Sequence, residues 1–400
     1  RGLGDVYKRQ RLSRHPEMLD AIVQAAPDFA TQQEGWEKEL RASAGEAPAV
    51  RADRVRRLRR IEEFKIMVEW LDGGDLGALQ EKLSGLADSC VSHGLRWLLD
   101  DEATRDDADW LGVGLGDVYK RQELTVHSDL DLVFLYRGAP NDGALFTRAE
   151  ATVKKLYRFL EQPTQAGIAY ELDTRLRPDG KKGPLAMPLD KFESYLTERA
   201  ERWERLAWTR YRVLTGSEDL AKDVTRVVSD FVYQGWDDSL PEYACHIRSR
   251  MENELGKEHA KNRFHLKVGH GGLSDIDFLM QLLQIRHGER APEWRVAGTR
   301  RLLADLPPTS LLDTDDATRL RNGHAFLRTL ETRLRIEADA GASTLSTDPA
   351  RLAVLGVRMG IPPPTGETLK RRYEQVTAEV REVFDRGMNR LEASSNGLVP

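Results

Sequence analysis

Apolar residues recur at helical spacing along most of the chain, and the pattern changes to strand-like alternation in a few places. Ser128–Tyr136 is rich in Val, Leu and aromatic residues, Ile168–Arg177 alternates between polar and apolar positions, and Trp110–Leu115 has the composition of a shorter strand. Helical periodicity predicts helices over residues 12–30 (weakly), 51–71, 76–99, 145–160, 189–209, 219–235, 240–259, 273–287, 315–338 and 367–391. Strands that flank a helix predict an α+β protein rather than an all-helical one.

The order of these elements divides the chain into four parts. We expect a helical segment over residues 1–103, a mixed α/β region over 104–188, an all-helical bundle over 189–392 and a frayed tail over 393–400. The length of 400 residues agrees with two or three domains at roughly 150 residues each. The mixed region is therefore expected to stand between two helical ones.

Two carboxylates stand at the entrance of the strand Ser128–Tyr136. Because side chains alternate along a strand, Asp129 and Asp131 project from the same face of the sheet. The rest of the strand is apolar on both faces, which predicts that it is covered on both sides. Like charges at this spacing repel each other, and a divalent metal ion would offset that repulsion. The alternative is that both acids face solvent as strand-end caps.

A third carboxylate, Asp173, lies on the alternating stretch Ile168–Arg177. If the two strands are neighbours, Asp129, Asp131 and Asp173 form a cluster of hard oxygen ligands suited to Mg²⁺, with substrate phosphates completing the shell. One of these acids could also assist deprotonation of an attacking hydroxyl. A pair of acids two residues apart is weak by itself, but a buried strand and a third acid make the pattern more specific.

Two arginines, Arg175 and Arg177, follow Asp173 on the same polar face. A guanidinium presents a planar fork of donors that fits phosphate, so both are candidate nucleotide-binding residues. The alternative is internal pairing with Glu171 or with the acids of the cluster. Ser128 is a further candidate, because its hydroxyl and backbone N–H could hold a phosphate, unless it serves only as a turn residue.

Two other clusters have both a functional and a structural interpretation. Gly271-Gly272 before a helix could form an anion-binding nest, but Asp275 and Asp277 favour a helix cap, and Ser274 with Asp277 has capping-box spacing. The helix over 51–71 carries a run of arginines that could contact phosphates, although the acids alongside favour a solvated face. These arginines are Arg54, Arg56, Arg57, Arg59 and Arg60.

Composition narrows the class of protein. Apolar residues make up 40% and charged residues 31% of the chain, which is ordinary for a globular protein. A net charge of −5 gives no general attraction to nucleic acids or acidic membranes. The two cysteines, Cys90 and Cys245, have neither disulfide nor metal spacing and fit a reducing compartment. Because no apolar run of about 18 residues and no signal core occurs, we expect a cytoplasmic protein.

The string GLGDVYKRQ occurs twice, at Gly2–Gln10 and at Gly114–Gln122. A structural repeat would recur over a longer period and with sequence drift. The two copies have unrelated surroundings and no third copy exists. We therefore interpret both copies as sequence-assembly artefacts rather than as a functional repeat.

Four motifs occur in the order that is typical of one enzyme family: SDLDLVFLY, YELDTRLRPDGKKGP, WERLAWTRYRV and HLKVGHGGLSDIDFLMQLLQIRHG. With them the chain resembles the bifunctional glutamine synthetase adenylyltransferase/adenylyl-removing enzymes from about Leu12 to Met388. Those enzymes have two homologous nucleotidyltransferase halves. One half transfers AMP from ATP to a tyrosine of glutamine synthetase, and the other removes it by phosphorolysis. This chain corresponds to one half, and the TRYRV and YELD segments favour the C-terminal, adenylylating half.

The resemblance implies a DNA polymerase β-like nucleotidyltransferase palm followed by a helical domain. It implies that Asp129 and Asp131 are the metal-binding pair and that Asp173 is the third catalytic carboxylate, with Mg²⁺ as cofactor and ATP as substrate. It further implies glutamine synthetase as the protein substrate and a PII-type regulatory protein as a further partner in nitrogen regulation.

The chain departs from the family pattern just before the acidic strand. The family has Gly-Gly or Gly-Ser followed by Arg-Glu-Leu there, whereas Lys120-Arg121-Gln122 precedes Glu123-Leu124 in this chain. Small residues at that place let the backbone close on the triphosphate. Three alternatives therefore stay open: the phosphorolytic half, an impaired palm that acts as a docking or regulatory module, and a nucleotidyltransferase acting on another target such as the PII protein.

Overall fold

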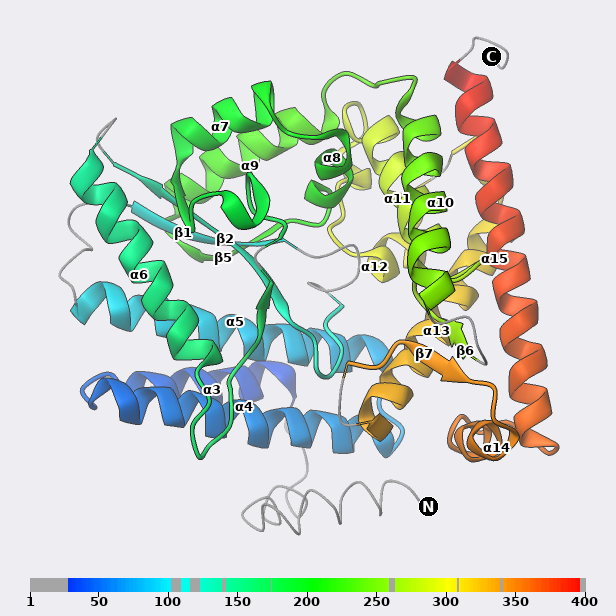
Figure 1. The fold of residues 1–400 in the computed structure, drawn as a ribbon, viewed down its shortest axis with the longest axis horizontal. Helices are drawn as coiled ribbons and strands as arrows, with labels where there is room; N and C mark the ends of the chain where they lie inside the picture. The colour runs from blue at the N-terminus through cyan, green and yellow to red at the C-terminus, as the bar shows by residue number, and fades with distance from the viewer. Residues whose placement is uncertain are drawn as a thin grey trace. The chain divides into compact units, whose positions relative to one another are not determined.

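The computed structural model describes most of the chain (Figure 1). The described residues are 28–101, 109–115, 123–138, 142–173, 175–258, 263–307, 309–338 and 341–395. By its internal contacts the chain divides into two compact units, Arg1–Phe231 and Val232–Pro400. The helix predicted weakly over residues 12–30 lies almost wholly outside the described residues, as does most of the second GLGDVYKRQ string.

Three helices precede the sheet of the first unit: α3 (Phe29–Ala42), α4 (Pro48–Leu71) and α5 (Leu76–Asp101). α4 and α5 confirm two predicted helices. α3 begins where the Asp28 side chain accepts a hydrogen bond from the Thr31 N–H at 3.0 Å, as expected of an N-cap residue. Its apolar positions are too sparse for the periodicity to predict it.

The arginine run of α4 is not the solvated face that the sequence favours. Arg56 is only 1% exposed and donates hydrogen bonds to backbone carbonyls of a distant segment. Arg57 is exposed, as predicted. One helix therefore carries both a buried and a solvated arginine at adjacent positions.

The sheet of the first unit has β2 (Leu130–Arg137) near its centre. β1 (Asp109–Leu115) pairs with it in antiparallel fashion, which confirms the short strand predicted there. β3 (Leu172–Asp173) and β4 (Ala186–Pro188) both run parallel to β2, at its beginning and near its end. The first seven residues of β2 are buried, as predicted for a strand covered on both faces. Helix α6 (Gly143–Glu161) forms the crossover between β2 and β3.

Two element predictions in this unit are wrong. The strand predicted over Ile168–Arg177 is reduced to the two residues of β3, because the chain turns immediately after Asp173. The helix predicted over 189–209 is divided into α7 (Leu189–Glu198) and α8 (Arg202–Trp208). Glu204 fixes the start of α8 through a capping box in which its side chain accepts from the Glu201 N–H at 2.9 Å.

The region after residue 188 is also not purely helical. β5 (Arg212–Gly216) pairs with β1 and completes the sheet order β3-β2-β1-β5. It is followed by α9 (Glu218–Tyr233). The compact units consequently divide after Phe231 rather than at the predicted boundary between 188 and 189, because the sheet needs a strand from this part of the chain.

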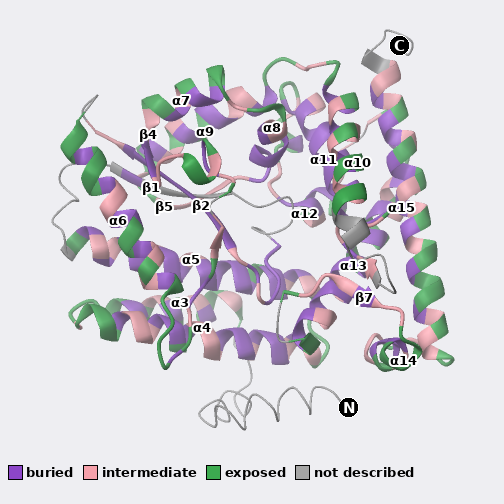
Figure 2. Ribbon diagram, in the orientation of Figure 1, coloured by how far each residue is buried: buried purple, intermediate pink, exposed green. Residues whose placement is uncertain are grey.

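The second unit is mainly helical and is built around α11 (Leu273–Gly288). Fourteen residues of α11 are buried, so this helix forms the core of the unit (Figure 2). Its neighbours include α10, α13 and α15, and a short antiparallel pair of strands, β6 with β7, interrupts the predicted all-helical bundle. The bounds are α10 Leu240–Glu258, β6 Arg263–His265, α12 Thr299–Ala304, α13 Thr314–Ala338, β7 Thr344–Ser346, α14 Pro349–Arg358 and α15 Thr365–Ser395.

These elements make the chain an α+β protein, as predicted. The helices predicted over 145–160, 219–235, 240–259, 273–287, 315–338 and 367–391 are all found with bounds shifted by a few residues. No helix among the described residues has the length and apolar character needed to cross a membrane.

Candidate functional site

The predicted acidic cluster lies where β2 and β3 begin to pair. The register aligns Leu130 with Leu172 and Asp131 with Asp173, and the Leu130 N–H donates to the Glu171 carbonyl at 2.8 Å. Neighbouring strands lie about 4.8 Å apart, and residues in register project to the same face. Asp131 and Asp173 are therefore cross-strand neighbours.

The three carboxylates differ in exposure. Asp131 is 1% exposed, whereas Asp129 and Asp173 are half-buried. A solvent-facing strand cap does not describe Asp131, because its side chain is hardly exposed to solvent. The acids thus stand at the edge of the buried core.

In the structure Asp173 is engaged by Arg175. The Arg175 Nε donates to the two Asp173 carboxylate oxygens at 3.0 and 2.8 Å, and the Arg175 backbone N–H donates to the same group at 2.9 Å. A further bond comes from Nη2. This geometry matches the internal-pairing alternative for Arg175, and it neutralises the third carboxylate.

The acids are aligned by the backbone but their side chains do not form a ready ligand set. Within the described ranges, no group of three or more His, Cys, Asp or Glu side chains is placed so that it could hold a metal ion. The carboxylates Asp129, Asp131 and Asp173 fit Mg²⁺ by donor type and by strand register. The arrangement of their side chains does not fit Mg²⁺ while Arg175 is bound to Asp173.

Ser128 lies in the segment that leads into β2. It is buried, and its Oγ lies 3.2 Å from the Thr125 Oγ1. His127 before it has φ 55°, a left-handed conformation that is uncommon for a residue with a side chain. Glu123 and Leu124, which match the last two residues of the Arg-Glu-Leu pattern, are buried. The Lys120-Arg121-Gln122 segment lies outside the described residues.

Arg177 holds a loop together. Its Nε donates to the Gly180 carbonyl at 2.9 Å and its Nη2 to the Lys181 carbonyl at 3.0 Å. The loop has no room for a side chain at Gly183, where a Cβ would lie 1.9 Å from the Pro178 carbonyl oxygen. Arg177 thus bonds the PDGKKG loop, and it also lies beside the buried Tyr157 hydroxyl of α6.

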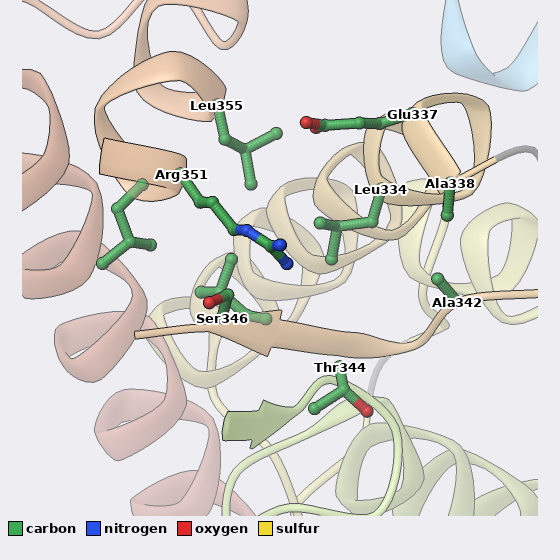
Figure 3. Close-up of a pocket in the computed structure, with 10 residues that line it drawn as sticks. Leu334, Glu337, Ala338, Ala342, Thr344, Ser346, Arg351 and Leu355 are labelled. Carbon is green, nitrogen blue, oxygen red and sulfur yellow. The ribbon is translucent and has the colours of Figure 1, made fainter. Parts of the chain in front are cut away.

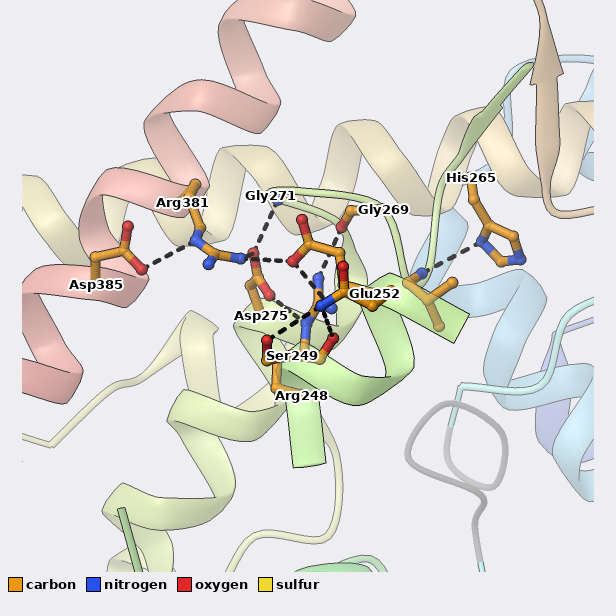
Figure 4. A network of polar contacts seen from close by, with 11 residues as sticks. Arg248, Ser249, Glu252, His265, Gly269, Gly271, Asp275, Arg381 and Asp385 are labelled. Atoms are coloured by element: carbon orange, nitrogen blue, oxygen red, sulfur yellow. Dashed lines mark hydrogen bonds and ion pairs between the residues drawn. The ribbon is translucent and has the colours of Figure 1, made fainter. Parts of the chain in front are cut away.

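The glycine pair before α11 is occupied by a carboxylate of the chain (Figure 4). The Asp275 carboxylate accepts from the Gly271 N–H at 2.8 Å and is paired with the buried Arg248. Arg381 of α15 reaches the same carboxylate at 3.4 Å. Gly271 has φ +66°, and a Cβ there would lie 1.7 Å from the Thr377 carbonyl oxygen, so glycine is required. The Asp275 carboxylate therefore takes the place that an anion would need at Gly271, although it does not cap α11.

The predicted capping box of Ser274 and Asp277 is wrong. The N-cap residue of α11 is Gly272, which makes no side-chain cap hydrogen bond. Asp277 is buried and accepts a hydrogen bond from the Thr299 hydroxyl instead. The spacing is misleading because the N-cap residue is Gly272, two residues before the Ser274 that the motif assumes.

Lys267 and His265, in the same segment, have structural contacts. Lys267 lies 3.8 Å from the buried Glu331 of α13, which also pairs with Arg328 and Arg335 at 3.0 Å. Burial raises the pKa of Glu331, but Arg335, Lys267 and Arg328 overcome it and lower that pKa to about 2. The His265 Nδ1 accepts from the Lys267 N–H at 3.2 Å, so the ring closes a turn.

A separate pocket of about 370 Å³ lies in the second unit between α13, β7 and α14 (Figure 3). Arg351 reaches into it from α14, while Glu337 at its rim is paired with Arg358 at 2.6 Å. None of the predicted site residues lines this pocket.

Two family models match separate parts of the chain. A family model described as glutamate-ammonia ligase adenylyltransferase matches residues 6–227, more than half of the chain. A second model, described as GlnD PII-uridylyltransferase, matches residues 246–387. The first match falls within the unit that contains the acidic cluster, and the second falls within the helical unit.

Curated relatives carry the same description. The bifunctional glutamine synthetase adenylyltransferase/adenylyl-removing enzyme of Bordetella pertussis is 29% identical over 415 residues, covering 94% of this chain and 44% of that protein. The enzyme of the same name from Brucella melitensis is 27% identical over 417 residues, covering 98% of this chain and 42% of that protein. The chain thus spans less than half the length of these relatives.

Proposed function

Because the chain belongs to the glutamate-ammonia ligase adenylyltransferase family, we propose that it transfers AMP from ATP to a tyrosine of glutamine synthetase. The observation that carries the proposal is the register of β2 and β3, which aligns Asp131 with Asp173 at the edge of a buried strand. The parallel crossover through α6 supports a polymerase β-like palm, and the names of the relatives support the acceptor. The reaction would run in the cytoplasm, as the adenylylating half of a longer enzyme.

Three carboxylates would hold Mg²⁺ in this site: Asp129, Asp131 and Asp173. The fit rests on donor chemistry and strand register, because carboxylate oxygens are the ligands that this ion prefers. When bound, the ion neutralises charge on the phosphate oxygens. The Arg175 guanidinium must leave Asp173 before that carboxylate can serve as a ligand.

The side chains around the acids would bind ATP and move a proton. Arg175, once released, offers a planar fork to phosphate oxygens, and Ser128 offers a hydroxyl and an N–H. Arg177 would contribute by holding the loop after β3, within reach of the same edge of the sheet. Asp173 would accept the tyrosine proton while the tyrosine oxygen bonds to the α-phosphorus of ATP and the bond to pyrophosphate breaks.

A second candidate acceptor follows from the match of the helical unit to the PII-uridylyltransferase model. In that case the same acids would transfer a nucleotide to a PII-type protein. A third candidate reaction is the phosphorolytic removal of AMP from glutamine synthetase. It would use the same carboxylates, with inorganic phosphate as the attacking species. An impaired palm that only docks glutamine synthetase or PII is the fourth.

One assay separates these candidates. The chain is incubated with Mg²⁺ and ATP labelled at the α-phosphate, with glutamine synthetase in one arm and PII protein in the other, and UTP replaces ATP in a parallel set. A third arm offers adenylylated glutamine synthetase with inorganic phosphate and measures ADP. Label on the tyrosine of glutamine synthetase is the expected result. A folded chain that is inactive in every arm would contradict the proposed reaction and leave the docking role.

A further inference from the structure

The strand that carries Asp173 is too short to be held in position by its pairing with β2 alone. β3 has two residues, and its pairing with β2 covers only Leu130–Leu172 and Asp131–Asp173. A two-stranded contact of this length is marginal in water, because few hydrogen bonds oppose the entropy of ordering the chain. Something outside the sheet has to hold the connector that runs from α6 to β3, residues 162–171.

The beginning of this connector is held by Arg56 of α4. The Arg56 Nη2 donates to the Phe159 carbonyl at 2.8 Å and to the Gln162 carbonyl at 2.7 Å. Both carbonyls belong to the end of α6, where backbone acceptors lack a partner within the helix. A cation at this end also opposes the negative pole of the helix dipole. Arg56 therefore fixes the point at which the connector starts.

The tip of the connector is held one turn away on the same helix. The Thr164 hydroxyl donates to the Asp53 carboxylate at 2.7 Å, and Arg60 donates to the Ala166 carbonyl at 3.3 Å. Asp53, Arg56 and Arg60 are three and four residues apart, so they form one stripe along α4. All three side chains of this stripe bond to the end of α6 or to the connector.

The end of the connector is held immediately before β3. The Arg59 guanidinium lies over the Tyr170 ring at 5.1 Å from its centre, and Glu63 holds that guanidinium at 2.9 Å. Tyr170 is buried. The Leu172 N–H donates to the Glu161 carboxylate at 2.9 Å. The residue before Asp173 is therefore held by Glu161 as well as by its pairing with Leu130 of β2.

We propose that Asp53, Arg56, Arg59 and Arg60 are positioning residues that set the place of Asp173 beside Asp131. The consequence for catalysis rests on the proposed function, whereas the positioning itself does not. Arg56 and Arg60 bond backbone carbonyls and Arg59 stacks on one aromatic ring, so these three arginines have structural contacts rather than forming a phosphate site. Arginine suits this task because one guanidinium can bond two carbonyls at once and still stack on a ring.

The test compares Arg56→Lys with Arg57→Lys. Both variants keep a positive charge on the same helix. Only the first removes a buried guanidinium whose Nη2 donates to two carbonyls, since Arg57 is exposed. Hydrogen–deuterium exchange of a peptide spanning Tyr170–Asp173 should become about tenfold faster in Arg56→Lys and stay unchanged in Arg57→Lys. Equal exchange in the two variants would overturn the proposal.

A second pair of variants changes only exposed side chains. Thr164→Val removes an exposed hydroxyl that bonds Asp53 and also accepts from the Ala166 N–H of the connector. Thr147→Val makes the same change at an exposed position of α6. In the AMP-transfer assay, Thr164→Val should lower kcat several-fold with KM for ATP within twofold, whereas a general loss of structure would lower the melting temperature. If the unmodified chain transfers no AMP, the proposed function fails while the exchange experiment still decides the positioning. If it transfers AMP and both threonine variants match it in kcat and exchange, the role of the Asp53 contact is refuted.

Discussion

Replacing Arg175 with Gln should strengthen metal binding by the chain before any nucleotide is added. In the structure the Arg175 side chain bonds both oxygens of the Asp173 carboxylate, at 3.0 and 2.8 Å. A cation that uses Asp173 as a ligand must displace this guanidinium. A neutral amide in its place competes far less, so the carboxylate becomes available at a lower cost.

The size of the effect follows from exposure. The Arg175 side chain is 67% exposed, so solvent screens the pair, and its net free energy is about 1 kcal/mol or less. That free energy corresponds to about fivefold in a dissociation constant. Removing a positive charge close to Asp129 and Asp131 acts in the same direction, so fivefold tighter binding is the expected scale.

The assay is a titration with Mn²⁺ followed by electron paramagnetic resonance, which measures the free ion directly. Arg199→Gln is the matched control, because Arg199 is also an exposed arginine of the first unit and pairs with Asp179 at 3.3 Å. The Arg175 variant should bind Mn²⁺ about fivefold more tightly than the control. If the two variants bind Mn²⁺ equally, Asp173 is not a ligand that Arg175 withholds, and the reasoning fails.

Three further predictions concern single groups. Asp131→Asn should abolish Mn²⁺ binding and AMP transfer without lowering the melting temperature, since the buried side chain keeps its shape. Glu331 has its pKa lowered from 4.5 to about 2, so the free energy of unfolding should fall by about 3 kcal/mol as the pH drops from about 4.5 to 2, and in Glu331→Gln denaturant titrations should lack that fall. Replacing Lys120-Arg121-Gln122 with Gly-Ser-Arg should raise the affinity for ATP; calorimetry giving the same affinity with and without the change would contradict this.

The central strand and the long helices could be predicted because their signals are local. β2 follows from a run of apolar residues with two acids at its start, and its burial on both faces confirms the pattern. The alternation predicts a longer strand than β3, because it continues to Arg177. The backbone turns after Asp173, whose carboxylate accepts from the Arg175 N–H. A turn made by a side chain bonding its own backbone leaves the alternation of residue types unchanged.

The arginines of α4 could not be interpreted from local sequence. Arg56 bonds Phe159 and Gln162, which lie more than a hundred positions along the chain. A run of charges on a helix is normally solvated. Arg56 can be buried because carbonyls at the end of α6, which have no partner within that helix, accept its hydrogen bonds. The same reasoning explains why β5 was missed, since its pairing with β1 depends on a strand about a hundred residues away.

The pairing of Arg175 with Asp173 has a consequence for the order in which ligands bind. A lone divalent cation that takes Asp173 leaves the guanidinium without its carboxylate, whereas a metal–ATP complex brings a cation for Asp173 and phosphates for Arg175 together. The exchange then costs little, because each partner of the broken pair gains a new one. ATP should therefore tighten Mn²⁺ binding in the unmodified chain, and Arg175→Gln should remove most of that coupling. Equal coupling in the two proteins would mean that the arginine contacts no phosphate in the bound state.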